Sequence, residues 1–282
     1  MKSLLVFRPL NILIVGVLQV ITYYFLDFKT PTFNLEIVFL IVASVLITAA
    51  GYLFNDWMDQ TSDTFNKPSK LYISEWSNLG VWIVFILFNL IALGLCYLIS
   101  SNLVYWYAVV IALLLVYSVI LKRLPLFGNF AISVLAAFSV YVVFLVFGTQ
   151  DRKLVIFYAG FAALLTYLRE IVKDMEDIEG DRKAGYLTLP VMAGLPQSRM
   201  VVLITGVFTL AAYGNLLYQW LTTHFKMPVK VVFVGYQVLC VLIPLMAFVY
   251  LSYKANAKSD YARLSRLAKY IMATGMLSMM FY

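Results

Sequence analysis

Apolar runs long enough to cross a lipid bilayer recur along almost the whole chain. A membrane helix needs about 20 mostly apolar residues. Hydrophobic residues make up 63% of the 282 positions and charged residues only 12%, whereas a soluble domain has about 25% charged residues. We therefore predict an all-α, polytopic membrane protein with nine transmembrane helices. The expected spans are Leu10–Leu26, Leu35–Phe54, Leu79–Ile99, Leu103–Leu121, Phe127–Phe147, Leu154–Val172, Met200–Leu221, Val229–Tyr253 and Leu264–Phe281.

The chain shows no low-complexity tract and no linker between compositionally different parts. We therefore expect one domain over residues 1–282. No small-residue cleavage site closes the first apolar run, so we expect a retained helix and not a signal peptide. The two cysteines, Cys96 and Cys240, both lie inside apolar runs, where they are expected to pack and not to form a disulfide.

Basic residues predict the orientation in the membrane. With the N-terminus on the cytoplasmic side, 16 of the 21 Lys and Arg residues fall in cytoplasmic segments, as the positive-inside rule requires. This pattern predicts an integral protein of the cell inner membrane. It also explains the formal net charge of +7 without nucleic acid, which we do not expect as a partner.

Two aspartate triplets with the same spacing follow the second and sixth predicted spans. In each, the aspartates stand at i, i+3 and i+7, which on a helix places all three carboxylates within an arc of about 60°. Both triplets are predicted on the cytoplasmic side, in the longest connections of the chain, residues 55–78 and 173–199. The first motif is Asp56, Asp59 and Asp63, and the second is Asp174, Asp177 and Asp181, together six of the 14 acidic residues.

Three carboxylates on one helix face repel one another unless they are protonated or bind cations. Carboxylate oxygens suit Mg²⁺, which also takes phosphate oxygens as ligands. Two triplets that face each other can therefore hold a diphosphate through metal ions. The alternative is that each triplet is only a solvated helix end, and the repeated spacing argues against it. Asn55 is a candidate metal or aspartate partner, with a helix cap as its alternative role. The candidate phosphate-binding cations on the same side are Lys67, Lys122, Arg123, Arg169 and Lys173.

These residues resemble the two signature motifs of the UbiA superfamily of intramembrane prenyltransferases. The first motif reads Asn55-Asp56-x-x-Asp59-x-x-x-Asp63 and the second Asp174-x-x-Asp177-x-x-x-Asp181. Further matches cover nearly the whole chain: Arg8-Pro9-x-Asn11, Asn66-Lys67-Pro68, Leu121-Lys122-Arg123 followed by Gly128-Asn129, and Gly180-Asp181-x-Lys183-x-Gly185-x-x-Thr188-Leu189-Pro190.

The resemblance implies nine helices around a central cavity, with a cytoplasmic cap that carries the aspartates. It implies Mg²⁺-dependent transfer of a prenyl group from an isoprenyl diphosphate to a lipid or aromatic acceptor. Each triplet would then bind one of two magnesium ions. The region from Arg169 to Asp181 most resembles the digeranylgeranylglyceryl phosphate synthases, which would make geranylgeranyl diphosphate the donor and geranylgeranylglyceryl phosphate the acceptor. The family often has a tyrosine where this chain has Arg169, and an added cation suits a phosphate-bearing acceptor.

Three other functions remain open from the sequence. The first is an aromatic-acceptor prenyltransferase of quinone biosynthesis, of the 4-hydroxybenzoate or dihydroxynaphthoate type. The second is a cation transporter, which would need acidic residues near the middle of the membrane. A phosphatidyltransferase is the third, but such enzymes need an Asp-Gly and an Ala-Arg at close spacing before their later aspartates, and that pattern is absent. Besides donor, acceptor and membrane lipids, no obligate protein partner is expected.

Overall fold

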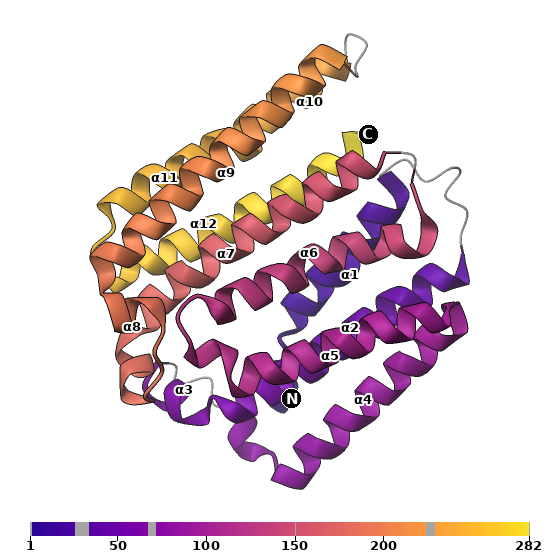
Figure 1. The fold of residues 1–282 in the computed structure, drawn as a ribbon, viewed down its shortest axis with the longest axis vertical. Coiled ribbons are helices and arrows are strands. Elements are labelled where there is room, and N and C mark those ends of the chain that lie inside the picture. The colour runs from indigo at the N-terminus through magenta and orange to yellow at the C-terminus, as the bar shows by residue number, and fades with distance from the viewer. Residues whose placement is uncertain (1, 26–33, 67–71, 150, 224–228, 282) are drawn as a thin grey trace.

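Each predicted apolar run is mainly helical over the residues that the structure describes. A computed structural model describes residues 2–25, 34–66, 72–149, 151–223 and 229–281, and the described residues contain helices and no strand. The long helices lie side by side in a bundle (Figure 1). They are α1 (Pro9–Phe25), α2 (Leu35–Met58), α4 (Asn78–Ile99), α5 (Ser101–Val119), α6 (Phe127–Phe147), α7 (Arg152–Lys183), α9 (Leu195–Thr223), α10 (Val229–Gln237), α11 (Ile243–Lys254) and α12 (Lys258–Leu277).

Short helical turns connect the long helices. A π-helical turn, Val238–Leu242, joins α10 to α11, so these two helices together fill the eighth predicted span. Two short α-helices, α3 (Gln60–Asn66) and α8 (Leu189–Ala193), lie at the same end of the bundle (Figure 1). The 3₁₀ turns are Lys2–Phe7, Tyr72–Glu75, Leu121–Arg123 and Ser278–Phe281.

Small polar side chains fix where several helices begin. Ser77 accepts a hydrogen bond from the backbone N–H of Gly80 at 3.0 Å and so caps α4. Ser100 does the same for α5, accepting from Leu103 at 3.1 Å. Such caps satisfy backbone donors that have no partner inside the helix. Because Ser100 alone separates α4 from α5, these helices are antiparallel neighbours, as their short connection predicts.

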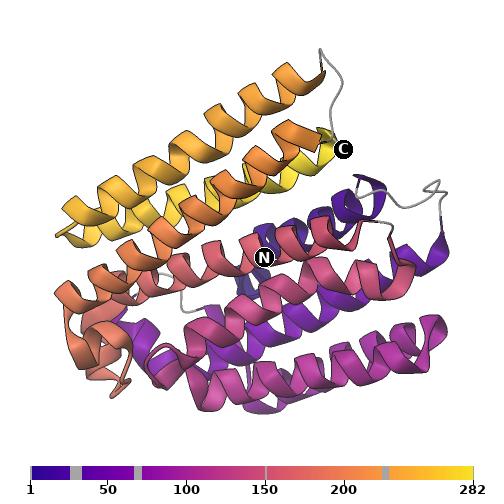
Figure 2. The same cartoon turned by 45° about the horizontal axis from the view of Figure 1, so that its top comes forward.

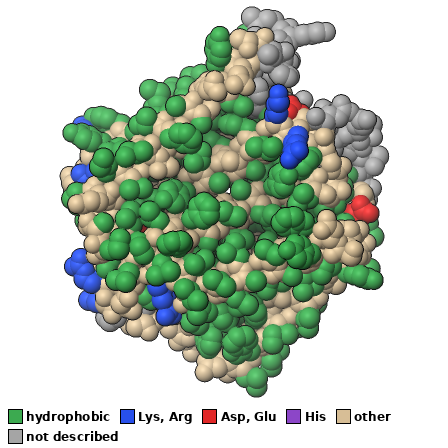
Figure 3. Space-filling model, in the orientation of Figure 1, with side chains coloured by type: hydrophobic (Ala, Val, Ile, Leu, Met, Phe, Trp, Pro, Cys, Tyr) green, Lys and Arg blue, Asp and Glu red, His purple; other side chains and the backbone are tan. Residues whose placement is uncertain are grey.

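Seven helical segments in the described part of the chain are long and apolar enough to cross a membrane: α2, α4, α5, α6, α7, α9 and the α10–α11 stretch. Helix α1 is shorter, with 17 residues, and α12 has charged residues in its first half. Apolar side chains cover most of the face in Figure 3, with Lys and Arg near its edges. Large apolar residues such as Leu98 (64% exposed) and Phe130 (63%) point outward, as lipid contact requires. The chain is an integral membrane protein.

Helix α7 connects the two halves of the bundle. Near its N-terminus, Leu154 and Tyr158 join the core that α1, α2, α4, α5 and α6 share. Further along, Leu165 and Ile171 join a second core with α9, α11 and α12. Helix α7 packs against α6 and α12 along its length, and Figures 1 and 2 show α7 between these neighbours. Its position in the core fixes the side chains near its C-terminal end.

Helix α7 is longer than its apolar run. The prediction ended this span at Val172 and placed the second aspartate motif in a connection, but the helix continues to Lys183. The hydrogen-bonded backbone does not stop where polar residues begin, and Arg182 and Lys183 suit the negative end of the helix dipole. Gly185, with φ +75°, ends the helix. The second motif therefore stands on the last turns of a long rigid helix.

Candidate active site between the two aspartate motifs

The first motif lies where α2 gives way to α3. Asp59 is the residue between the two helices, with φ −93° and ψ 5°, and Asp63 lies in the first turn of α3. The Asp59 carboxylate accepts hydrogen bonds from Asn55 at 2.9 Å and from the Tyr186 hydroxyl at 3.0 Å. It also pairs with the Lys122 ammonium at 2.6 Å. Three separate parts of the chain thus converge on Asp59.

Asp56 has a different partner from Asp59. It forms an ion pair with Arg8, whose guanidinium also lies 4.8 Å from the centroid of the Tyr52 ring. Arg8 precedes Pro9 and has φ +50°, a backbone conformation that non-glycine residues rarely adopt. Such strain persists where the surroundings impose it, commonly at functional sites. The contacts with Asp56 and Tyr52 therefore hold Arg8 in a fixed position at this end of the bundle.

The second motif lies on one face of α7. Asn129 of α6 donates to Asp174 at 2.7 Å, Lys173 pairs with Asp177 at 2.9 Å, and Thr188 donates to Asp181 at 3.3 Å. Asp177 and Asp181 are both buried, at 9% and 7% exposed. Buried carboxylates are stable only when they are paired or hydrogen-bonded, and these interactions supply the partners.

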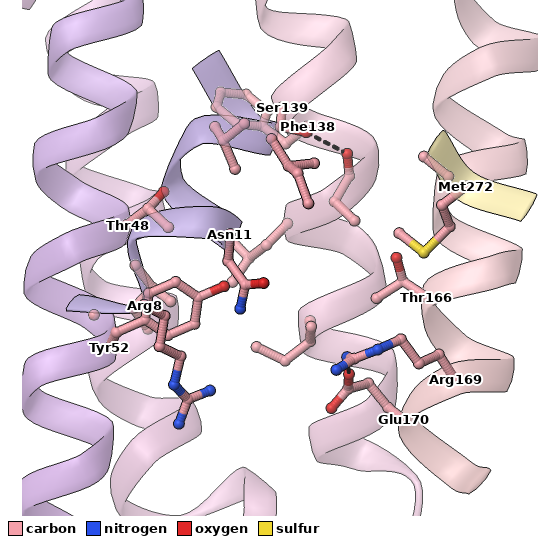
Figure 4. Close-up of a pocket in the computed structure, with 18 of the residues that line it drawn as sticks. Arg8, Asn11, Thr48, Tyr52, Phe138, Ser139, Thr166, Arg169, Glu170 and Met272 are labelled. Carbon is pink, nitrogen blue, oxygen red and sulfur yellow. Dashed lines mark hydrogen bonds and ion pairs between the residues drawn. The ribbon is translucent and has the colours of Figure 1, made fainter. Parts of the chain in front are cut away.

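One cavity of about 440 Å³ brings the two motifs together. This size falls within the usual range of small-molecule sites, about 300–1,000 Å³. Figure 4 shows one wall formed by α1 and α2, with Arg8, Asn11 and Tyr52, and the opposite wall by α7 and α12, with Thr166, Arg169 and Met272. The sequence-predicted residues that line the cavity are Asn55, Asp59, Asp63, Lys122, Arg169, Lys173, Asp174, Asp177 and Asp181.

The remaining sequence-predicted residues have other positions. Asp56 contacts Arg8 and is not among the cavity-lining residues. Arg123 is also outside the lining, and its guanidinium lies 5.4 Å from the centroid of the Tyr186 ring. Lys67 lies outside the described residues. Their roles in the site stay predictions.

Away from the aspartates, the cavity is mostly apolar. Its walls there include Leu114, Leu135, Phe138, Leu165 and Met276. An apolar channel that ends in a cluster of carboxylates and ammonium groups suits an amphiphile with a charged head and a long hydrocarbon tail.

A small polar cluster interrupts the apolar walls. The Gln19 amide donates to Ser44 at 2.8 Å, and Ser44 shares a short hydrogen bond with Tyr107. All three side chains are buried and line the cavity.

Comparison with known proteins agrees with this geometry. Residues 16–270 match the UbiA prenyltransferase family. The chain belongs to the UbiA prenyltransferase family. It is 31% identical over 276 residues to the digeranylgeranylglyceryl phosphate synthase of Methanococcoides burtonii, covering 94% of this chain and 91% of that protein. It is 33% identical over 219 residues to the synthase of the same name from Methanoregula boonei, covering 73% of each.

Solved UbiA structures share the fold. A digeranylgeranylglyceryl phosphate synthase structure aligns with a TM-score of 0.73 at 23% identity, over 99% of this chain and 96% of the other. A UbiA homologue from Archaeoglobus fulgidus bound to GPP and Mg²⁺ aligns with a TM-score of 0.71 at 15% identity, over 99% of each chain. The same homologue has also been solved bound to Cd²⁺. At these identities the likeness establishes the fold of the bundle.

The residues of this UbiA chain fit a divalent metal by their chemistry. Carboxylate oxygens are hard ligands of the kind that Mg²⁺ prefers, and five of the six motif aspartates line one cavity. Within the described ranges, no three His, Cys, Asp or Glu side chains converge tightly enough to form a complete metal site. A divalent ion would therefore complete its coordination with diphosphate oxygens and water, as Mg²⁺ commonly does.

Several residues of the site were not among the candidates from sequence, Arg8 and Thr188 among them. Tyr186 and Asn129 lie inside stretches that resemble the family, and each contacts a motif aspartate. Burial, followed by the nearby Asp59 carboxylate, raises the pKa of the Tyr186 hydroxyl, so this group stays protonated and donates. Lys269 lines the cavity from α12. It falls inside a predicted membrane span, where an ionisable residue is costly and indicates function, and that signal could have identified it.

Proposed function

We propose that this protein transfers a prenyl group from geranylgeranyl diphosphate to the free hydroxyl of geranylgeranylglyceryl phosphate. The observation that carries the proposal is the single cavity with carboxylates of both motifs at one end and apolar walls beyond them. The charged end suits a diphosphate, and the apolar walls suit an isoprenoid chain. The names of relatives that match up to 94% of the chain support the phosphate-bearing acceptor.

The reaction exchanges one C–O bond for another. The bond between the allylic carbon and the diphosphate oxygen breaks, and its electron pair leaves with the diphosphate. The acceptor hydroxyl oxygen forms an ether bond to the same carbon and releases its proton. No oxidant or reductant is needed.

The chain's own residues bind and orient the charged head. The Lys122 and Lys173 ammonium groups lie beside Asp59 and Asp177, where they can donate hydrogen bonds to phosphate oxygens. Asn55 and Tyr186 hold the Asp59 carboxylate in place. When bound, two Mg²⁺ ions held by the cavity-lining aspartates of the two motifs would neutralise the charge that develops on the leaving diphosphate.

We also propose that the whole chain, residues 1–282, acts as one prenyltransferase domain with nine membrane-spanning helices, α1 and α12 included. The N-terminus and the aspartates would face the cytoplasm across the inner membrane, under a cap formed by α3 and α8. The concentration of Lys and Arg on one predicted side supports this orientation.

The test is product analysis with purified protein in lipid nanodiscs. Labelled geranylgeranyl diphosphate and Mg²⁺ are supplied with one acceptor at a time: geranylgeranylglyceryl phosphate, 4-hydroxybenzoate or dihydroxynaphthoate. We expect mass spectrometry to show the digeranylgeranyl ether and release of diphosphate. A prenylated aromatic product without the ether would overturn the assigned acceptor. If no acceptor were prenylated and the vesicle-reconstituted protein carried cations, a transporter would be the better account.

A further inference from the structure

Two cations that line the cavity are not paired with motif aspartates. Lys122 and Lys173 contact Asp59 and Asp177. In contrast, Arg169 pairs with its sequence neighbour Glu170, and its buried Nε has no hydrogen-bond partner in the part of the chain that the structure describes. Within the described part of the chain, Lys269 has no side-chain hydrogen bond or ion pair, although it lines the same cavity.

Arg169 and Lys269 come from helices that pack against each other, α7 and α12. Lys173 and Glu170, both of α7, line the same cavity as Arg169 and Lys269. Because Arg169 is paired with Glu170 and Lys173 with Asp177, Lys269 adds uncompensated positive charge beside two other cations on this wall of the cavity. Like charges repel across a partly buried space, and a bound anion would relieve the repulsion.

A third polar group faces the same space. Thr166 lies one helical turn before Arg169 and lines the cavity, and Figure 4 shows it close to Arg169 on the same wall. Its side chain is only 5% exposed, and its hydroxyl has no hydrogen-bond partner among the described residues. A buried hydroxyl without a partner is costly, and threonine in a helix can usually bond to the preceding turn. A ligand oxygen would satisfy it.

We propose that Thr166, Arg169 and Lys269 form a subsite for the phosphate monoester of the acceptor, separate from the aspartates that hold the diphosphate. This inference rests on the proposed function. A guanidinium and an ammonium together match a doubly charged phosphate. The aspartates, by contrast, need metal ions before they can bind an anion. Two anionic substrates can therefore occupy one cavity because each has its own counter-charges.

The experiment compares two acceptors, geranylgeranylglyceryl phosphate and the same lipid without its phosphate. For each variant, kcat/KM is measured with both acceptors, and the ratio of the two values reports recognition of the phosphate. We expect Lys269→Gln and Arg169→Gln each to lower this ratio by about 10-fold to 100-fold, the effect of a lost hydrogen bond to a charged group. The KM for geranylgeranyl diphosphate should change by less than about 2-fold in both variants.

Matched variants separate a local effect from a general loss of charge or of folding. Lys269→Arg keeps the cation and should restore most of the ratio. Lys258→Gln removes a lysine from the same helix outside the cavity lining and should leave the ratio unchanged. If Arg169→Gln folds poorly, the exposed Lys269 still provides the test.

The outcomes distinguish the two proposals. An unchanged ratio in Lys269→Gln and Arg169→Gln, with active protein, would overturn the subsite and leave the proposed reaction intact. A KM that rises for the diphosphate donor instead of the acceptor would also overturn it, because the cations would then belong to the diphosphate site. If wild-type protein prenylates neither lipid, the proposed function itself has failed.

Discussion

The two aspartate motifs have the same spacing but different local structures. The second stands on an uninterrupted helix, α7, that both cores hold in place. The first is divided between α2 and α3, with Asp59 at the junction. An i, i+3, i+7 pattern therefore specifies a shared helix face only where the helix continues.

Their partners differ as well. Asp174, Asp177 and Asp181 are held by α6, by α7 itself and by the segment before α8. Asp56 and Asp59 are held by residues from the N-terminal segment, the turn after α5 and the segment after α7. The first motif thus depends on distant parts of the chain for its backbone position as well as its partners, whereas α7 alone fixes the backbone of the second. Mutations should reveal this difference.

Removal of the metal should have the largest effect because it disables both motifs together. We expect EDTA to lower prenyl transfer by about 1,000-fold or more, since the diphosphate would leave without its Lewis acid. Added Mg²⁺ should restore the rate. Full activity in EDTA-treated protein, with metal content checked by mass spectrometry, would contradict the role given to both motifs.

Asp59→Asn and Asp177→Asn should each lower kcat by about 100-fold to 1,000-fold, the usual effect of losing one group that stabilises developing charge. Both side chains line the cavity, and each contacts a lysine. Steady-state kinetics at saturating Mg²⁺ provides the measurement. A large loss in only one of the two variants would mean that the motifs do not act on the same diphosphate.

Asp56→Asn should have a smaller effect, about 10-fold in kcat/KM, corresponding to one charge-assisted hydrogen bond. Its carboxylate binds Arg8 and does not line the cavity, so it acts on the site through Arg8. Arg8→Gln should produce a similar loss, and the double variant should lose little more than either single one. Fully additive losses would show that the two residues act separately.

Tyr186→Phe should have the smallest effect, a loss of about 5-fold, because one hydrogen bond to Asp59 disappears while Lys122 and Asn55 still hold the carboxylate. Because burial and Asp59 raise the pKa of Tyr186, its hydroxyl remains a donor above pH 10, where an ordinary tyrosine ionises. The wild-type to Tyr186→Phe rate ratio should therefore stay constant up to pH 10. A ratio that falls towards one below that pH would contradict this position for Tyr186.

The sequence predicted the helices better than it predicted their ends. Run length and hydropathy located the long apolar helices of the described residues, because a segment that crosses lipid must be both apolar and helical. The same criterion stopped α7 at Val172, although helical hydrogen bonding continues through charged residues to Lys183. It also gave no sign that Asp59 would separate two helices, since a local change of backbone direction depends on tertiary packing.

The aspartates of the site were predictable from the sequence, because their spacing and their place after particular helices can be read from it. Spacing identified the aspartates, and the parity of the helices placed both motifs at one end of the bundle. The roles of Tyr186 and Lys269 do not follow from residue spacing. Tyr186 reaches Asp59, and Lys269 reaches the cavity, only in the folded chain. For Lys269 the one sequence signal was its position inside the predicted span Leu264–Phe281, where an ionisable residue is costly.

Metal binding in the presence of an uncleavable donor tests most directly whether the two motifs hold one ligand. Mn²⁺ can replace Mg²⁺ as a spectroscopic probe, with binding followed by electron paramagnetic resonance while geranylgeranyl thiolodiphosphate is titrated. We predict that wild-type protein binds Mn²⁺ much more tightly with the diphosphate analogue present, and that Asp59→Asn and Asp177→Asn each abolish that gain. Wild-type behaviour in either variant would contradict a shared metal–diphosphate site.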